Sequence, residues 1–325
     1  MKPFEFHSTF RRWLVLAALV IPTVVQAQSW KAAVGGQSVN KGRQALAFLP
    51  NEMWVHAGDS ITWNFIPDEI HTVSFLTPGQ VRLPFMVGCP GTTPDGSTFD
   101  GSACVNSGPS TNGQTYTVVF PAAGNFKLVC LVHANMTAVV HVLDPSQPLP
   151  HNQDFYEDEA ADERHDLLSD TDHDMDHGHG EVPPNAVTAG VGEIVATAGG
   201  SHTVSVMRFI HSTKLVHVGD TVEWTNSDPV TPHTITFGVV PQDLIDPSSN
   251  VTADADGARH ADISSTADNV HSGFIAAARQ DQIGLPQPPP GVTRFRVTFT
   301  KAGVFNYVCA LHDNLGMLGK VIVRP

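Results

Sequence analysis

Basic residues are scarce in this chain. Its 325 residues include 18 Lys and Arg against 32 Asp and Glu, which gives a formal net charge of −14. Proteins that hold nucleic acids need a basic patch or stripe to neutralise the phosphates, and no part of the sequence offers one. We therefore expect no nucleic-acid partner.

Long apolar runs are missing beyond the N-terminus, although a membrane helix needs about 20 apolar residues. The first 27 residues differ, because three Lys and Arg precede an apolar run over residues 13–25 that ends next to the small-x-small pattern Val-Gln-Ala. This order is typical of a secretory signal peptide. We predict a signal peptide over residues 1–27, cleaved after Ala27, no stable membrane insertion, and a periplasmic or secreted location.

Cysteine is also rare, with four residues that fall into two groups. Cys89 and Cys104 lie in a stretch rich in Gly, Pro, Ser and Thr. An oxidising compartment favours a disulfide between two such cysteines. We predict the disulfide Cys89–Cys104, with two unrelated free thiols as the alternative.

The other two cysteines each open the same motif, Cys-x2-His followed by Met after two or four further residues. Its two copies are Cys130, His133 and Met136, and Cys309, His312 and Met317. A thiolate, an imidazole and a thioether on one short loop are the soft, mixed ligands of a mononuclear blue copper centre, which needs one more imidazole. His71 and His233 are the candidates for it, since each begins an alternating apolar pattern that predicts a strand. The sequence therefore predicts two copper sites.

The two halves of the sequence repeat one another. Residues 55–63 match residues 216–224, and each segment ends in a tryptophan that we expect in a hydrophobic core. Both halves alternate apolar and polar positions over short segments separated by Gly-Asp, Pro-Gly and Ala-Gly turns, without helical periodicity. This pattern predicts an all-β sandwich in each half.

Residues 148–185 separate the two halves and are strongly acidic, with 12 acidic residues and one Arg over residues 150–182. Low hydrophobicity and like charge favour disorder. We predict a disordered linker between loosely tethered domains, with a short acidic helix over residues 155–168 as the alternative. The segment also places imidazoles beside carboxylates, which either bind a metal ion weakly or belong to a solvated spacer. These imidazoles are those of His173, His177 and His179.

The repeated motifs resemble those of cupredoxin domains of the plastocyanin and azurin family. The shared features are the Cys-x2-His segment followed by Met, an upstream His-Thr, and an Ala-Gly turn and strand that lead to the Cys. The shorter loop in the first half resembles that of amicyanins, and the longer second loop that of plastocyanins. The resemblance implies two Greek-key β-sandwich domains, over residues 28–147 and 186–325, each with one type 1 (blue) copper ion. The implied ligands are His71, Cys130, His133 and Met136 in the first domain, and His233, Cys309, His312 and Met317 in the second.

In such domains two imidazoles and the thiolate form a trigonal plane, and the methionine is a weak axial ligand that tunes the redox potential. We therefore expect a copper-binding electron carrier with two type 1 copper ions and redox protein partners of unknown identity. Thr72 and Thr234 follow the upstream histidines where the family commonly has Asn. The hydrogen bonding around the thiolates is expected to differ accordingly.

Copper nitrite reductases and two-domain laccases also pair cupredoxin domains, so an enzyme is the first alternative. Such enzymes need further histidines for a second copper centre, usually with a His-Cys pair. Val129 and Val308 precede the two cysteines here, and the one His-x-His lies in the linker, at residues 177–179. The alternatives are an oxidase or reductase with a catalytic copper at a domain or subunit interface, and a periplasmic copper-binding or buffering protein.

Residues 239–291 form a long, partly proline-rich loop in the second half. Such a loop covers the metal site, forms a docking surface or is a disordered insertion. Residues 270–273 match residues 105–108, which indicates that part of the loop is ordered.

Overall fold

The computed structural model describes residues 26–80, 82, 89, 91–177, 183–278 and 292–325, without the side chains of residues 170–177. The predicted signal peptide therefore lies outside the described residues, apart from its last two positions. Within the described part, no helix combines the length and the apolar character that a membrane crossing needs.

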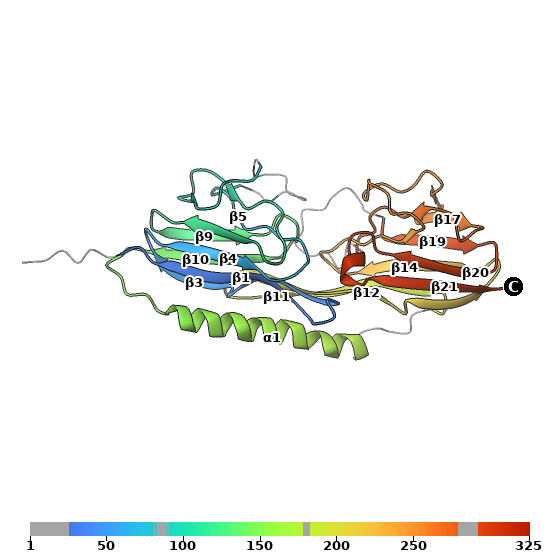
Figure 1. Ribbon diagram of the computed structural model, residues 1–325, viewed down its shortest axis with the longest axis horizontal. Helices are drawn as coiled ribbons and strands as arrows, with labels where there is room; N and C mark the ends of the chain where they lie inside the picture. The colour runs from blue at the N-terminus through green and yellow to red at the C-terminus, as the bar shows by residue number, and fades with distance from the viewer. Residues whose placement is uncertain (1–25, 81, 83–88, 90, 178–182, 279–291) are drawn as a thin grey trace, which may run out of the picture.

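The described chain is built mainly of β-strands, which form two lobes side by side (Figure 1). The strands of the first lobe are β1 (Ser29–Gln37), β2 (Arg43–Leu49), β3 (Glu52–His56), β4 (Ser60–Phe65), β5 (Ser74–Phe75), β6 (Ser97–Thr98), β7 (Val105–Asn106), β8 (Thr115–Val119), β9 (Gly124–Val129) and β10 (Thr137–Leu143). Burial alternates along strands such as β3 and β4, because successive side chains of a strand point to opposite faces of the sheet. The predicted all-β class is confirmed.

The second lobe repeats the strand pairing of the first. Its strands are β11 (Ala186–Ala196), β12 (Ser201–Ile210), β13 (Thr213–His217), β14 (Thr221–Ser227), β15 (Thr236–Phe237), β16 (Thr252–Ala253), β17 (Arg259–Ile263), β18 (Val270–His271), β19 (Arg294–Phe299), β20 (Gly303–Val308) and β21 (Leu318–Arg324). In the first lobe β1 pairs antiparallel with β2 and parallel with β4, and in the second β11 pairs antiparallel with β12 and parallel with β14. The strand that ends at the motif cysteine pairs antiparallel with the next strand in both lobes, as β9 with β10 and β20 with β21.

Each lobe has its own hydrophobic core. Trp63 and Phe75 are buried in the first core, and Trp224, Phe295 and Tyr307 in the second. Both tryptophans therefore serve in core packing, as the sequence pattern predicts.

The two lobes share a continuous sheet, so the expected loose tether is wrong. β12 pairs with β11 on one side and with β2 of the first lobe on the other, in the register Val204 to Ala45. Arg208 of β12 adds a second connection, because its guanidinium donates to the carbonyl oxygen of Leu315 at 2.7 Å and to that of Asn40 at 2.6 Å. The loop that carries His312 is thereby tied to the first lobe.

The linker is a helix over much of its length. α1 (Gln153–His177) lies along the sheet beneath β1, β2 and β12 (Figure 1). The side chain of Asn152 caps it by accepting from the backbone N–H of Phe155 at 3.0 Å. Tyr156 and Leu167 are buried against the lobes. The prediction of a disordered linker is therefore wrong for this segment, because apolar residues at helical spacing bury one face and offset the repulsion between the acidic residues.

The loops that sequence composition singled out are partly ordered. The disulfide Cys89–Cys104 is confirmed, with its Cα atoms 5.7 Å apart. Residues 239–278 contain the short strands β16, β17 and β18, which confirms order in that part of the loop, and residues 279–291 lie outside the described chain.

Candidate metal centres

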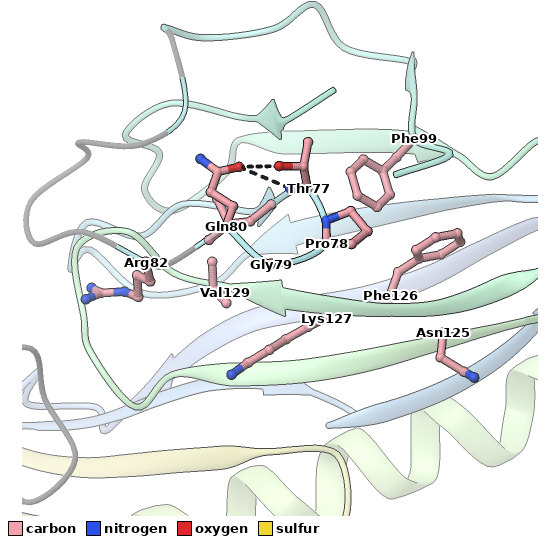
Figure 2. Close-up of a pocket in the computed structure, with 11 residues that line it drawn as sticks. Thr77, Pro78, Gly79, Gln80, Arg82, Phe99, Asn125, Phe126, Lys127 and Val129 are labelled. Atoms are coloured by element: carbon pink, nitrogen blue, oxygen red, sulfur yellow. Dashed lines mark hydrogen bonds between the residues drawn. The ribbon is translucent and has the colours of Figure 1, made fainter. Parts of the chain in front are cut away.

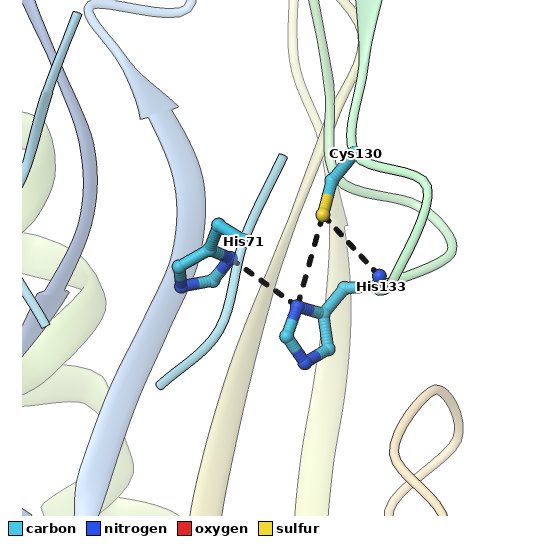
Figure 3. A group of neighbouring side chains, drawn as sticks. All are labelled: His71, Cys130 and His133. Carbon is cyan, nitrogen blue, oxygen red and sulfur yellow. Dashed lines mark hydrogen bonds between the residues drawn. The ribbon is translucent and has the colours of Figure 1, made fainter. Parts of the chain in front are cut away.

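The first site gathers side chains from three separate segments. His71 forms an isolated bridge with Ser110, Cys130 directly follows β9, and His133 lies in the turn before β10. The two Nδ1 atoms of His71 and His133 are 3.2 Å apart, and the Sγ of Cys130 lies 3.9 Å from the Nδ1 of His133 (Figure 3). The three ligand atoms all lie within 4.8 Å of one another, so they converge on one point.

The second site has the same arrangement. The Nδ1 atoms of His233 and His312 are 3.2 Å apart, and the Sγ of Cys309 lies 3.8 Å and 3.3 Å from them. A Gly in the left-handed conformation at Gly316 ends the turn that carries His312, and the backbone N–H of Cys309 then donates to the carbonyl oxygen of Met317 at 3.1 Å. Among the described residues, these are the two groups in which three candidate ligands lie together.

Both cysteines are fully buried and yet favour the thiolate form. Burial alone would raise the pKa of Cys130, but hydrogen bonds and charge from His133 and His71 lower it well below its usual value. Burial likewise opposes ionisation of Cys309, and the charge of His312 with a hydrogen bond to His233 lowers its pKa well below normal. The thiolate is the form of cysteine that binds metals.

A glycine lies directly behind each upstream histidine. β-Bulges in β1 and β11 give Gly35 and Gly190 positive φ angles of 68° and 73°. A Cβ atom at Gly190 would lie 2.0 Å from the Nε2 of His233, and one at Gly35 would lie 2.9 Å from the Nε2 of His71. The bulges therefore make room for the two imidazoles and hold their Nδ1 atoms toward the thiolates.

Backbone and threonine groups fix the two sulfur atoms. The N–H groups of Thr72 and Thr234 donate to the Sγ of Cys130 and of Cys309, each at 3.4 Å. The hydroxyl of each threonine accepts from the N–H of the residue after the cysteine, at 2.8 Å for Leu131 and 2.7 Å in the second site. Thr72 and Thr234 thus make the hydrogen bonds around the sulfur atoms, at positions where the resembling family commonly has Asn.

Met136 and Met317 are both fully buried in the hydrophobic cores. The backbone N–H of Cys130 donates to the carbonyl oxygen of Met136 at 3.0 Å, the counterpart of the contact between Cys309 and Met317. Each methionine therefore closes the loop that its cysteine opens.

Two buried carboxylates contact the outer nitrogens of the histidines. Glu69 lies with Oε1 3.3 Å from the Nε2 of His133 and Oε2 3.7 Å from the Nε2 of His312. Burial would raise the pKa of Glu69, but the two imidazoles lower it to about 2. Asp228 lies 3.8 Å from the Nε2 of His233 and accepts hydrogen bonds from Ser205 and from the N–H groups of residues 230 and 231.

These contacts set the protonation of two imidazoles in the metal-free protein. Burial opposes the charge on His133, but Cys130 and Glu69 raise its pKa to about 10. Burial also opposes the charge on His233, and Asp228 with Cys309 raises its pKa to about 9. Metal binding at these nitrogens is therefore expected to release protons.

A cavity of about 240 Å³ is lined in part by β9, the strand that ends directly before Cys130 (Figure 2). Arg82 stands at one end of it and Phe99 and Phe126 at the other. The guanidinium of Arg82 donates to the carbonyl oxygen of Cys130 at 2.8 Å and to that of Leu131 at 3.1 Å. Arg82 therefore holds the backbone that carries the thiolate.

Sequence reasoning missed several residues that shape the sites, namely Gly35, Gly190, Glu69, Asp228, Arg82 and Arg208. An isolated glycine within a predicted strand often marks a bulge or a close approach of another group. This rule could have identified Gly35 and Gly190. The charged residues act through contacts between distant segments, for which one sequence holds no signal. The side chains of His173 and His177, and all of His179, lie outside the described residues, so the suggested linker site stays a prediction.

Residues 195–324 match the profile of the plastocyanin/azurin family of copper-binding proteins. Among solved structures, a reduced amicyanin variant is 19% identical and matches over 35% of this chain and 82% of its own, with a TM-score of 0.25. Amicyanin from Paracoccus versutus is 18% identical over 38% of this chain and 86% of its own, also with a TM-score of 0.25.

Strand pairing and the two buried groups define an all-β protein with two candidate His/Cys/His metal centres. The family match covers residues 195–324, so this part of the chain is similar to the plastocyanin/azurin family, and copper is the metal that the match and the two groups support.

Proposed function

We propose that the chain carries single electrons through two type 1 copper sites, one in each lobe. The observation that carries this proposal is the convergence of two Nδ1 atoms and one cysteine sulfur at a buried point in each lobe, with a buried methionine on the same loop as the cysteine. The proposed ligands are His71, Cys130, His133 and Met136, and His233, Cys309, His312 and Met317. Copper bound by such a set supplies a one-electron couple between Cu(I) and Cu(II).

The residues around each site favour fast electron exchange because they are buried and held by hydrogen bonds. The imidazoles of His71 and His233 are fully buried, and His133 and His312 are 2% and 3% exposed. Fixed hydrogen bonds to sulfur and to the loop backbone limit rearrangement when charge changes. Burial also keeps water from the ligand positions, which disfavours the binding of a substrate there.

We further propose that the lobes correspond to domains over residues 28–147 and 186–325, and that the chain is exported after cleavage at Ala27. Redox proteins are the proposed partners. The confirmed disulfide Cys89–Cys104 supports an oxidising location, since disulfides persist mainly outside the cytosol.

Copper content, visible absorption and EPR of the oxidised full chain test the two sites. We expect two copper ions per chain with thiolate-to-copper absorption, and the loss of one ion in each of the variants Cys130→Ser and Cys309→Ser. The two variants are controls for each other, because each leaves the other site intact. A copper ion that lacks the thiolate band and persists in both variants would instead support an enzyme with a further catalytic centre.

A further inference from the structure

Glu69 is the one described residue whose side chain contacts an imidazole of each candidate site. It lies in the loop between β4 and β5, is 8% exposed, and faces His133 of its own lobe and His312 of the other lobe. Each of these imidazoles turns its Nδ1 toward a thiolate and its Nε2 toward the same carboxylate. One buried side chain thus separates the two metal centres.

We propose that Glu69 couples the two centres and provides the route for electron exchange between them within one chain. This proposal rests on the proposed function. In the exchange, one centre is oxidised by one electron and the other is reduced by one, so no bond breaks and no further reactant is needed. The route runs from Cys130 through His133, Glu69 and His312 to Cys309.

Burial strengthens this connection. At 3.3 Å the contact of Glu69 with the Nε2 of His133 is within hydrogen-bond reach, whereas the 3.7 Å contact with the Nε2 of His312 is electrostatic. Low local polarity strengthens such contacts further. Because His133 and His312 are almost completely buried, the outer edge of each ring meets Glu69 or protein rather than an external partner.

The surrounding structure keeps the two rings at a fixed separation. β2 and β12 form a ladder between the lobes, and Arg208 joins Leu315, three residues after His312, to Asn40 of the first lobe. Val230 of the second lobe packs against the first hydrophobic core. The position of Glu69 between the rings therefore follows from the joining of the lobes.

Asp228 provides a matched comparison. It is also a buried carboxylate near the Nε2 of a candidate ligand, at 3.8 Å from His233, but the residues that it contacts lie within the second lobe. Removing its charge alters the environment of one centre without touching the proposed route.

The bridge itself is tested in the metal-free full chain by NMR of its histidine rings. We expect Glu69→Gln to move the ring resonances of both His133 and His312, and Asp228→Asn to move those of His233. A Glu69→Gln variant that changes only His133 would show that the carboxylate serves one site and would overturn the bridge.

The route is tested in the copper-loaded full chain by pulsed one-electron reduction, followed by visible absorption. A Met136→Gln background separates the potentials of the two centres, because the axial ligand tunes the potential. We expect an exchange rate that does not depend on protein concentration. Glu69→Ala should lower this rate by roughly tenfold or more, which corresponds to ~1.4 kcal/mol in the barrier, and Asp228→Asn should change it much less.

The outcomes separate this proposal from the proposed function. Two blue centres with the same exchange rate in Glu69→Ala would overturn the route and leave the electron carrier intact. A parent chain without two blue centres would contradict the proposed function, while the metal-free NMR experiment would still decide the bridge. Should Glu69→Ala lose copper, Glu69→Gln takes its place in the rate measurement, with the same two outcomes.

Discussion

Glycines packed against the upstream histidines shape each site together with the candidate ligands. His233 and His71 rest against Gly190 and Gly35, each at a bulge with a positive φ angle. Glycine adopts this conformation without strain and leaves the space that an imidazole fills. The bulge glycines therefore determine whether the Nδ1 atoms reach the thiolates.

Gly190→Ala is expected to abolish the second copper site and leave the first intact. Its Cβ would lie 2.0 Å from the Nε2 of His233, so the imidazole must leave its position. Copper content and EPR of the variant should show the loss of one blue centre.

Gly219→Ala is the matched control for that variant. Gly219 has a φ of 94° and no atom within 4 Å of the added Cβ, so the change imposes backbone strain without a collision. Strain of this kind costs roughly 1–2 kcal/mol, and we expect both blue centres to persist. Equal loss of copper in the two variants would contradict the role assigned to Gly190.

The cysteine and histidine within each motif were predictable as neighbours because the motif is local. Cys130 and His133 are three residues apart and share one turn, so their spacing alone brings them together. Glu69 and Asp228 were not predictable, because their contacts join segments far apart in the chain. A lone acidic residue has no sequence signature that tells a buried bridge from a solvated side chain.

Among the elements, α1 departs most from expectation. Its composition is that of a disordered segment, yet Tyr156 donates to the carbonyl oxygen of Trp54 at 3.0 Å and Leu167 packs over β2. Propensity and charge describe the isolated segment, whereas its folding depends on the sheet it covers. The strands, by contrast, were predictable from the alternation of apolar and polar residues along the sequence.

Glu163 makes the docking of α1 depend on pH. Its carboxylate accepts from the backbone N–H of Asn51 at 3.0 Å. Burial and, to a lesser extent, the charge of Glu159 raise its pKa from 4.5 to about 7, against the effect of the Asn51 hydrogen bond. The folded chain thus binds more protons than the unfolded chain between these two values.

This shift predicts a loss of stability as pH rises. The contribution of Glu163 is complete below the unfolded pKa and is lost as pH rises through the folded pKa of about 7. Urea unfolding at a series of pH values from about pH 5 to about pH 8 measures this loss. Over that range, the unfolding free energy of the parent chain should fall by about 1–2 kcal/mol relative to that of Glu163→Gln, a magnitude that allows for the partial exposure of Glu163.

Asp162→Asn serves as the control, since Asp162 is exposed on the same helix. The difference in unfolding free energy between Asp162→Asn and the parent chain should stay constant across the pH range. If Glu163→Gln and the parent chain keep a constant difference in unfolding free energy, the assignment of this pH dependence to Glu163 is wrong.

In the whole molecule, the two lobes are joined through a shared sheet and are not loosely tethered. β12 is buried along most of its length because it pairs with strands of both lobes, and α1 covers the junction. The sequence could predict each sandwich from local alternation and turns. It could not predict the ladder between β2 and β12, because the pairing residues are about 160 positions apart and neither strand specifies its neighbour.

This arrangement brings both candidate metal centres to the junction, where Glu69 contacts His133 and His312. The proposed coupling of the centres therefore depends on the joining of the lobes. The proposed electron carrier holds its two candidate centres in lobes that one sheet joins.

The most direct test of the central claim is a coulometric redox titration of the copper-loaded full chain, followed by visible absorption. The account predicts the reversible uptake of two electrons per chain, each with loss of thiolate-to-copper absorption, and no uptake by a variant that combines Cys130→Ser with Cys309→Ser. Electron uptake that persists in the double variant would reveal a redox centre outside the two His/Cys/His groups and would contradict the account.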